Sequence, residues 1–200
     1  MTMKSNKTAK EESTYLILSQ VRESFGRVVY SHKVHEKQAD ICFSKHRWQQ
    51  GVLIGLTAIG SVTFLTEVVG LLANRTAASL TTSLVALLVT WASLGAKTFN
   101  YFEEAEAHRA TASQLWTVRE SYISLITDLM SGDISGVDAQ VRRDELQEKV
   151  YAIYSVAPRT SGRAFKRAQD GLKNNEEMTF DPREIDLFLP EALRFNDDKD

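Results

Sequence analysis

The most constraining feature of the sequence is a long apolar stretch at residues 51–96, which contains only two charged residues, Glu67 and Arg75. A bilayer core about 30 Å thick is crossed by roughly 20 residues of helix. The stretch holds two segments of that length, at about 51–72 and 76–96, separated by three residues. We therefore expect two transmembrane helices that form a tight antiparallel hairpin.

Basic residues beside the apolar stretch predict the orientation of the hairpin. By the positive-inside rule, basic flanks of transmembrane helices lie in the cytoplasm. The link between the two segments contains only Arg75, whereas the outer flanks contain Lys33, Lys37, Lys45, Arg47, Lys97 and Arg109. We expect both termini in the cytoplasm, with Trp48 and Tyr101 as aromatic anchors at the same membrane interface.

The segments around the hairpin predict an all-α membrane protein. Residues 1–12 are polar and expected to be mobile. Apolar residues then recur at three- and four-residue steps over about 13–47 and again over about 97–131, which is typical of amphipathic helices. We expect these two segments to extend the hairpin as long antiparallel cytoplasmic helices, here called the arms. A third helix is expected at about 137–157, with one or two shorter helices within 158–200.

The apolar positions predict which helix faces pack together. In the first arm they are Leu18, Val21, Phe25 and Val28, broadened by Tyr15, Leu16 and Ile17. In the second arm they are Leu115, Val118, Tyr122, Leu125 and Leu129, and in the third helix Val141, Val150, Ile153 and Val156. Because no proline occurs before Pro158, residues 76–130 are expected to form one continuous helix with Gly132 as its C-cap.

An antiparallel pair of arms brings residues equidistant from Asn74 side by side. This register places Asp40 beside His108 and Arg109, and Lys45 beside Glu103. The charges are complementary, but exposed ion pairs contribute at most about 1 kcal/mol. Solvated helix faces without specific pairing are an equally good interpretation.

The C-terminal segment, residues 158–200, is basic at first and acidic afterwards. Its basic part, with Arg159, Arg163, Lys166 and Arg167, is interpreted as an amphipathic helix end, with binding of lipid phosphates as the alternative. Direct nucleic-acid binding is not expected, because few aromatic residues are interspersed. In the acidic part, Asp181 and Pro182 fit the N-cap and first position of a short helix that stops before Pro190. This helix either docks on a partner or folds back against the third helix, and we favour folding back.

The sequence contains no convincing catalytic or cofactor-binding constellation. His32, His35 and Glu36 share one region of the first arm, with Asp40 as the only further ligand on that face, and zinc needs a preorganised set. Polar contacts between helices are the favoured role of these residues. Cys42 has no general base that the sequence identifies, and no glycine-rich phosphate loop is present. We expect no catalytic residue, no bound metal and no cofactor.

One hairpin cannot enclose water, so conduction would require several copies. Gly51 and Gly55 form a G-x-x-x-G motif, which permits close helix packing. Ser83 and Thr90 belong to a weakly polar strip on the second span, and Glu67 is an ionisable residue within the first. Such residues usually face protein or water. We interpret Glu67, Ser83 and Thr90 as pore-lining or gating candidates, with placement of Glu67 in the outer interface as the alternative.

Residues 27–41, RVVYSHKVHEKQADI, and residues 105–129, AEAHRATASQLWTVRESYISLITDL, with the hairpin between them, resemble the SLATT domain, a two-transmembrane effector domain of bacterial conflict systems. The resemblance covers about residues 13–157. It implies a location in the bacterial inner membrane and a pore-forming or membrane-disrupting role without catalytic residues. The partners that it implies are a cyclic-oligonucleotide synthase, a SLOG-type nucleotide sensor or a defence reverse transcriptase.

Two functional hypotheses follow. In the first, the chain is a membrane effector that oligomerises when a nucleotide-making or nucleotide-sensing partner triggers it, and then opens a pore or disrupts the membrane, which causes abortive infection. In the second, it is a non-conducting anchor or scaffold that recruits or inhibits a neighbouring defence enzyme.

Overall fold

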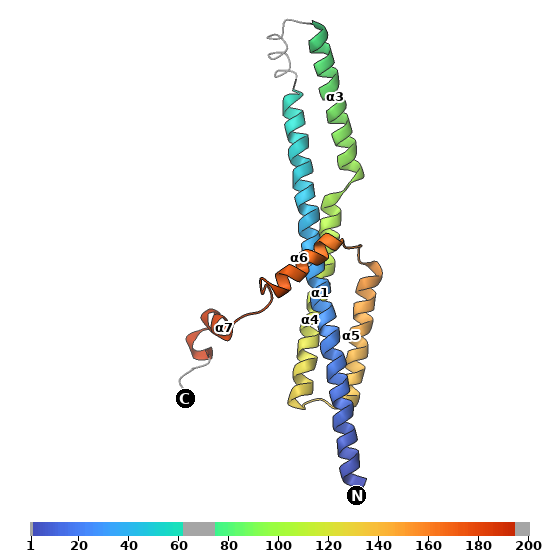
Figure 1. Cartoon of the computed structure of the whole chain (residues 1–200), viewed down its shortest axis with the longest axis vertical. Helices are drawn as coiled ribbons and strands as arrows, with labels where there is room; N and C mark the ends of the chain where they lie inside the picture. The colour runs from blue at the N-terminus through green and yellow to red at the C-terminus, as the bar shows by residue number, and fades with distance from the viewer. Residues whose placement is uncertain (1, 62–74, 195–200) are drawn as a thin grey trace.

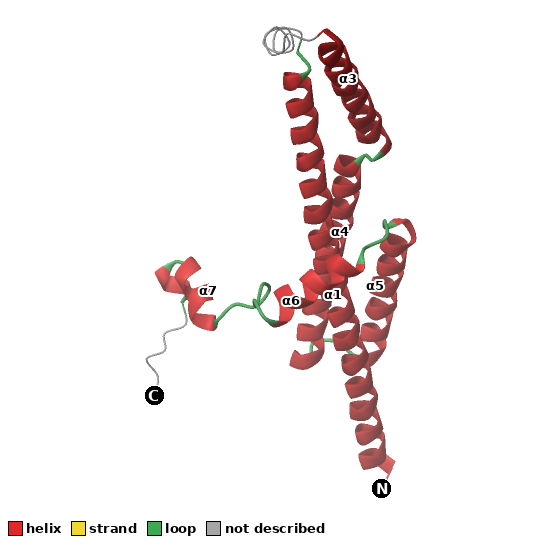
Figure 2. Ribbon diagram, turned by 45° about the horizontal axis from the view of Figure 1, so that its top comes forward, coloured by secondary structure: helices red, strands yellow, loops and turns green. Residues whose placement is uncertain are grey.

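A computed structural model describes residues 2–61 and 75–194 of the chain, and these residues form helices and short connections (Figure 2). Helix α1, Thr2–Ile59, runs through 58 residues without a break, which corresponds to about 87 Å at 1.5 Å per residue. Its C-terminal end lies antiparallel to α3, Arg75–Thr98, and its central part lies antiparallel to α4, Tyr101–Ser131 (Figure 1). The expected all-α architecture with long antiparallel helices is confirmed.

Among the described residues, no helix is both long and apolar enough to cross a membrane. Residues 62–72 of the first expected span, which include Glu67, lie outside the described residues.

The main core lies where α1 and α4 pack with α5, Gly136–Val156 (Figure 1). Residues from all three helices meet there because apolar side chains recur about once per helical turn on each contacting face. Tyr122, Leu115 and Leu125 are the largest apolar side chains that are fully buried. The buried cluster consists of Ile17, Val21, Val28, Leu115, Val118, Tyr122, Leu125, Leu129, Ala139 and Leu146.

Several apolar residues do not occupy the core positions that the sequence predicts. Tyr15 and Leu16 are exposed, because the face of α1 that meets the other helices runs through Ile17 and Val21 instead. On α5, Val141 and Val156 are exposed. Their places are taken by Ala139 and Leu146, with Val150 and Ile153 packed beside them as expected.

The prediction of one continuous helix over residues 76–130 is wrong. The chain breaks between α3 and α4 at Phe99 and Asn100. Asn100 is the N-cap of α4, and its side chain accepts a hydrogen bond from the backbone N–H of Glu103 at 3.4 Å. Asparagine favours such ends because its side chain satisfies a free N–H of the first turn. The C-cap at Gly132 is confirmed, with a left-handed φ of 79° that glycine adopts without strain.

The C-terminal segment forms helix α6, Gly162–Lys173, followed by α7, Pro182–Phe188, and a short 3₁₀ turn, Glu191–Leu193. Asp181 caps α7 and Pro182 opens it, as predicted. The expected folding back of this helix against the third helix is wrong. In Figure 1, α6 crosses α1 and α7 lies away from the other helices, and Leu187 and Phe188 on α7 are each 74% exposed.

Candidate functional site

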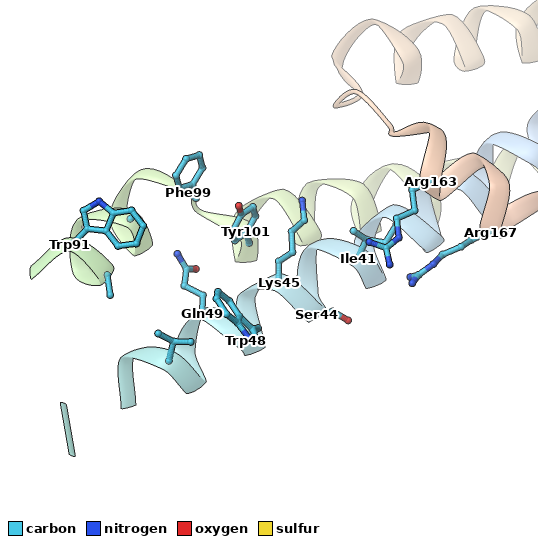
Figure 3. A pocket seen from close by; sticks show the side chains of 13 residues that line it. Ile41, Ser44, Lys45, Trp48, Gln49, Trp91, Phe99, Tyr101, Arg163 and Arg167 are labelled. Carbon is cyan, nitrogen blue, oxygen red and sulfur yellow. The ribbon is translucent and has the colours of Figure 1, made fainter. Parts of the chain in front are cut away.

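A groove of about 550 Å³ lies where α6 crosses the middle of the molecule, between α1, α3 and the start of α4 (Figure 3). Aromatic side chains and three cations line it, and we call it the aromatic-basic groove. Its aromatic residues are Trp48, Trp91, Phe99 and Tyr101, and its cations are Lys45, Arg163 and Arg167. The groove therefore brings together the two predicted interface anchors, Trp48 and Tyr101, with half of the basic patch predicted from the C-terminal segment.

The charges of the groove come from two sides. In Figure 3, Lys45 on α1 extends alongside Tyr101, and the ammonium nitrogen lies 5.0 Å from the centre of the ring, within the range of a cation–π interaction. Arg163 and Arg167 extend from α6. Neither arginine forms an ion pair with a carboxylate of the described residues. A site with apolar walls and uncompensated cations suits an amphipathic anion.

Gln38, a buried residue of α1, holds the N-terminus of α6 in place. Its side-chain oxygen accepts hydrogen bonds from the backbone N–H of Ser161, at 3.0 Å, and from the hydroxyl of the same residue, at 2.7 Å. Ser161 is the N-cap of α6. The small residues Ala164 and Ala168 then let the helix backbone pack closely on α1, where they form a buried cluster with Val34 and Ile41.

Glu177 holds the segment that follows α6. Its carboxylate lies 2.9 Å from the ammonium nitrogen of Lys33 and 2.8 Å from that of Lys37. Gly171 makes room for this carboxylate, because a Cβ at position 171 would stand 2.8 Å from it. Hydrogen bonds from Lys37 and Lys33 lower the pKa of Glu177 to about 2. The ion pairs thus fix α6, with its two arginines, on α1.

This ion-pair cluster predicts an acid-sensitive attachment of α6. Because the pKa of Glu177 is about 2 in the fold and 4.5 as a reference value, its stabilising effect is complete above about pH 4.5 and is lost as the pH falls toward 2. We expect the protection factors of the α6 amides, the intrinsic divided by the observed exchange rate, to fall in that window. Glu177→Gln should show low protection already at pH 7, with little further change in acid. An identical acid response in both proteins would contradict this assignment.

Among the described residues, no ion pair joins the arm charges that the sequence register places side by side. Asp40 and Arg109 line one cavity of about 480 Å³. His108, however, faces His35, and Lys45 faces Tyr101. A hydrogen bond of the α4 N-cap involves the backbone of Glu103, and no ion pair joins its side chain to Lys45 within the part of the chain that is described. Specific charge pairing of these residues stays a prediction.

Ser83 and Thr90 belong to α3 and Gly51 and Gly55 to the C-terminal end of α1, two helices that run side by side in the upper part of Figure 1. Ser83 and Thr90 are exposed on α3, and Thr90 donates a hydrogen bond to the carbonyl of Ala86. A Cβ added at Gly51 or Gly55 would meet no atom of the described chain within 4 Å. Both glycines therefore leave room for a neighbour outside the chain, and their role in packing, like that of Ser83 and Thr90 in a pore, stays a prediction.

A polar cluster is buried between the arms, and the contact of His35 with His108 agrees with the polar contacts between helices that the sequence favours. Nδ1 of His35 lies 2.9 Å from Nδ1 of His108. Burial, together with the nearby His108 and His32, lowers the pKa of His35 to about 4. The pKa of His108 is also lowered by burial. The sequence holds a further indication of this cluster, since His35 and Cys42 are two helical turns apart and so lie on one face of α1.

The fold and the groove together define a class of protein: a helical hairpin on long helical arms, with aromatic and basic residues gathered where the arms join the hairpin. Residues 17–184 match the model of the SMODS and SLOG-associating 2TM effector domain family 4. Because this match covers most of the chain, the protein belongs to that family, SLATT_4, and the predicted resemblance is confirmed. No curated protein and no solved structure matches the chain significantly.

Membership gives the function in outline. The family consists of effector domains of conflict systems that associate with SMODS and SLOG proteins, and its name describes two transmembrane helices. The family is generally described as non-enzymatic. The match extends to residue 184, beyond the 13–157 of the sequence resemblance, and so includes α6 and the groove that it forms.

Proposed function

We propose that the protein is a non-enzymatic effector of the bacterial inner membrane, with both termini in the cytoplasm, that oligomerises and opens a pore when a nucleotide-making or nucleotide-sensing partner triggers it. The consequence is loss of membrane potential and abortive infection. The observation that carries this proposal is the continuity of α1, which passes without a break from the α1–α4–α5 core to the side of α3.

The two connections between the core and the hairpin differ in continuity, which supports a role in transmitting movement from the core to the hairpin. A helix that continues for 58 residues carries a rotation or displacement at one end to the other. The second connection, from the hairpin back to the core, is interrupted, because α3 and α4 are separate helices that meet at Phe99 and Asn100. A movement of the core can thus reach the hairpin through α1 while α3 swings about this joint.

A pore requires several copies, and the hairpin offers surfaces for assembly. Leu80, Leu87 and Trp91 on α3 are exposed, and Gly51 and Gly55 on α1 permit close approach by another helix. In an assembled ring, Ser83, Thr90 and Glu67 would face water. The lipid bilayer and further copies of the chain are accordingly the first partners that we propose.

Membrane potential tests this proposal directly. The chain is expressed in bacteria with its activating partner, and a potential-sensitive dye is read alongside viability. We expect depolarisation to precede cell death. Glu67→Gln should abolish most of the depolarisation if this carboxylate lines water, whereas Glu145→Gln, a change of an exposed carboxylate on α5, should not. Cells that die while their membranes stay polarised would refute the pore.

A second function, recruitment of a defence enzyme, is favoured by one observation. Helix α7 exposes Leu187 and Phe188, and Phe180 just before it is exposed as well. Such side chains suit a partner protein surface. Replacing the hairpin by an unrelated transmembrane hairpin separates the two functions. A recruiting anchor would stay active, and a pore-forming effector would lose its activity.

A further inference from the structure

Three side chains of metal-ligating type meet between the two arms. Cys42 on α1 and Glu104 and His108 on α4 each offer one ligand atom, and these atoms lie within 4.8 Å of one another. Cys42 and His108 are completely buried, whereas Glu104 is exposed. Ligand atoms lie about 2.0–2.3 Å from a zinc ion. Atoms already this close need only small side-chain rotations to share one ion.

A second observation points to a ligand at the same place. The Nε2 atom of His108 is buried and has no hydrogen-bond partner among the residues that are described. A buried polar atom without a partner is destabilising, so native structures rarely leave one. Coordination of a cation would use the lone pair of this nitrogen and remove the cost.

His35 is placed to prepare His108 for that role. The Nδ1 atoms of His35 and His108 face each other at 2.9 Å, so one of them carries the hydrogen and donates a hydrogen bond to the other. When His108 donates, its Nε2 carries the lone pair. A hydrogen bond from the second ring nitrogen is what commonly orients a metal-binding histidine.

The sulfur ligand also has a supporting neighbour. The side-chain amide of Gln38 donates a hydrogen bond to Sγ of Cys42 at 3.3 Å, which stabilises negative charge on sulfur. The thiol proton of Cys42 goes to solvent as the metal–sulfur bond forms. Mixed sulfur, nitrogen and carboxylate ligands suit Zn²⁺.

We propose that Cys42, Glu104 and His108 form a Zn²⁺ site that joins the two arms, with His35 as a positioning residue and a water molecule at the open coordination position. The ion would tie α1 to α4 just before the aromatic-basic groove, because Lys45 and Tyr101 of the groove are each three residues from a ligand. Zinc binding therefore fixes the relative position of the arms where they enter the hairpin.

Metal titration of the full chain in detergent tests the site. Zn²⁺ is added in competition with a chromophoric chelator, and we expect one ion per chain. Loss of an outer-shell partner typically lowers metal affinity 10–100-fold, so His35→Gln should fall in that range. Cys42→Ser and Glu104→Gln remove ligands and should lower affinity by more than about 100-fold. With Co²⁺ as the probe, the wild type should show thiolate-to-metal charge-transfer absorption that Cys42→Ser lacks.

A matched carboxylate on the same helix provides the control. Glu106 is exposed and pairs with Arg109 at 3.4 Å, and Glu106→Gln should bind Zn²⁺ like the wild type. Because Glu104 is exposed, Glu104→Gln should keep its helix content and lose only the rise in melting temperature that Zn²⁺ gives. The site is refuted if the wild type binds no Zn²⁺, or binds it as tightly as both ligand variants. Either result leaves the pore proposal standing, since membrane potential is not measured here.

Discussion

Leu115→Ala is expected to destabilise the core by about 2–5 kcal/mol, the usual cost of removing most of a buried leucine side chain. Leu115 has no exposed surface and lies in the cluster shared by α1, α4 and α5. The lost methyl groups leave a cavity that the long helices cannot easily close, because each is anchored along its length. Since α1 connects this core with the hairpin, the variant should also lose effector activity.

Hydrogen exchange of α4 amides measures the loss in the full chain in detergent. Exchange through global opening should accelerate about 30-fold or more, the factor that corresponds to 2 kcal/mol. Met130→Ala, a truncation on the same helix at a residue that is 70% exposed, should change stability by less than about 0.5 kcal/mol. Equal exchange in the two variants would show that Leu115 is not part of a cooperative core.

Replacing both arginines of the groove, Arg163→Gln with Arg167→Gln, is expected to weaken the preference for anionic lipid about 30-fold. This prediction rests on the proposed membrane location. A basic residue near an anionic membrane surface contributes about 1 kcal/mol, so two residues contribute about 2 kcal/mol, or a factor of about 30. The aromatic walls hold acyl or glycerol groups while the guanidinium groups bind phosphate.

Tryptophan fluorescence reads this interaction inside the groove, because Trp48 and Trp91 line it. The protein is placed in zwitterionic nanodiscs, and anionic lipid with brominated chains is titrated in to quench these residues. Arg142→Gln is the control, since Arg142 lies on α5 and pairs with Asp128 at 2.7 Å. Quenching that is the same for the double variant and the control would exclude headgroup binding by α6. Inorganic phosphate should not compete if lipid is the ligand.

Local and periodic features were predictable from the sequence. Val21, Val28, Leu115 and Tyr122 recur at helical spacing, and each is buried as expected. The caps at Gly132 and Asp181 were also predicted, because both act through residues close in sequence. Helical spacing and helix caps depend on residues that are close together in the chain, so the sequence alone specifies them.

The break at Asn100 was predictable in principle but missed. Asn100 and Glu103 have the spacing of a helix start, yet the surrounding apolar and helix-favouring residues suggested continuity. The position of α6 is a different case. The hydrogen bond from Ser161 to Gln38 joins residues 123 positions apart, and the contact between His35 and His108 joins residues 73 positions apart. No local pattern specifies such contacts, so neither the groove nor the pairing of His35 with His108 was foreseen.

The attachment of α6 makes its position depend on the rotation of α1. Every described anchor of α6 belongs to α1: Gln38 at its N-cap, Val34 and Ile41 beneath it, and Lys33 and Lys37 at its end. If α1 turns about its own axis, α6 must move with it. Arg163 and Arg167 then move around the end of the hairpin that is nearest the core. A small twist in the core thereby becomes a sideways displacement of two positive charges.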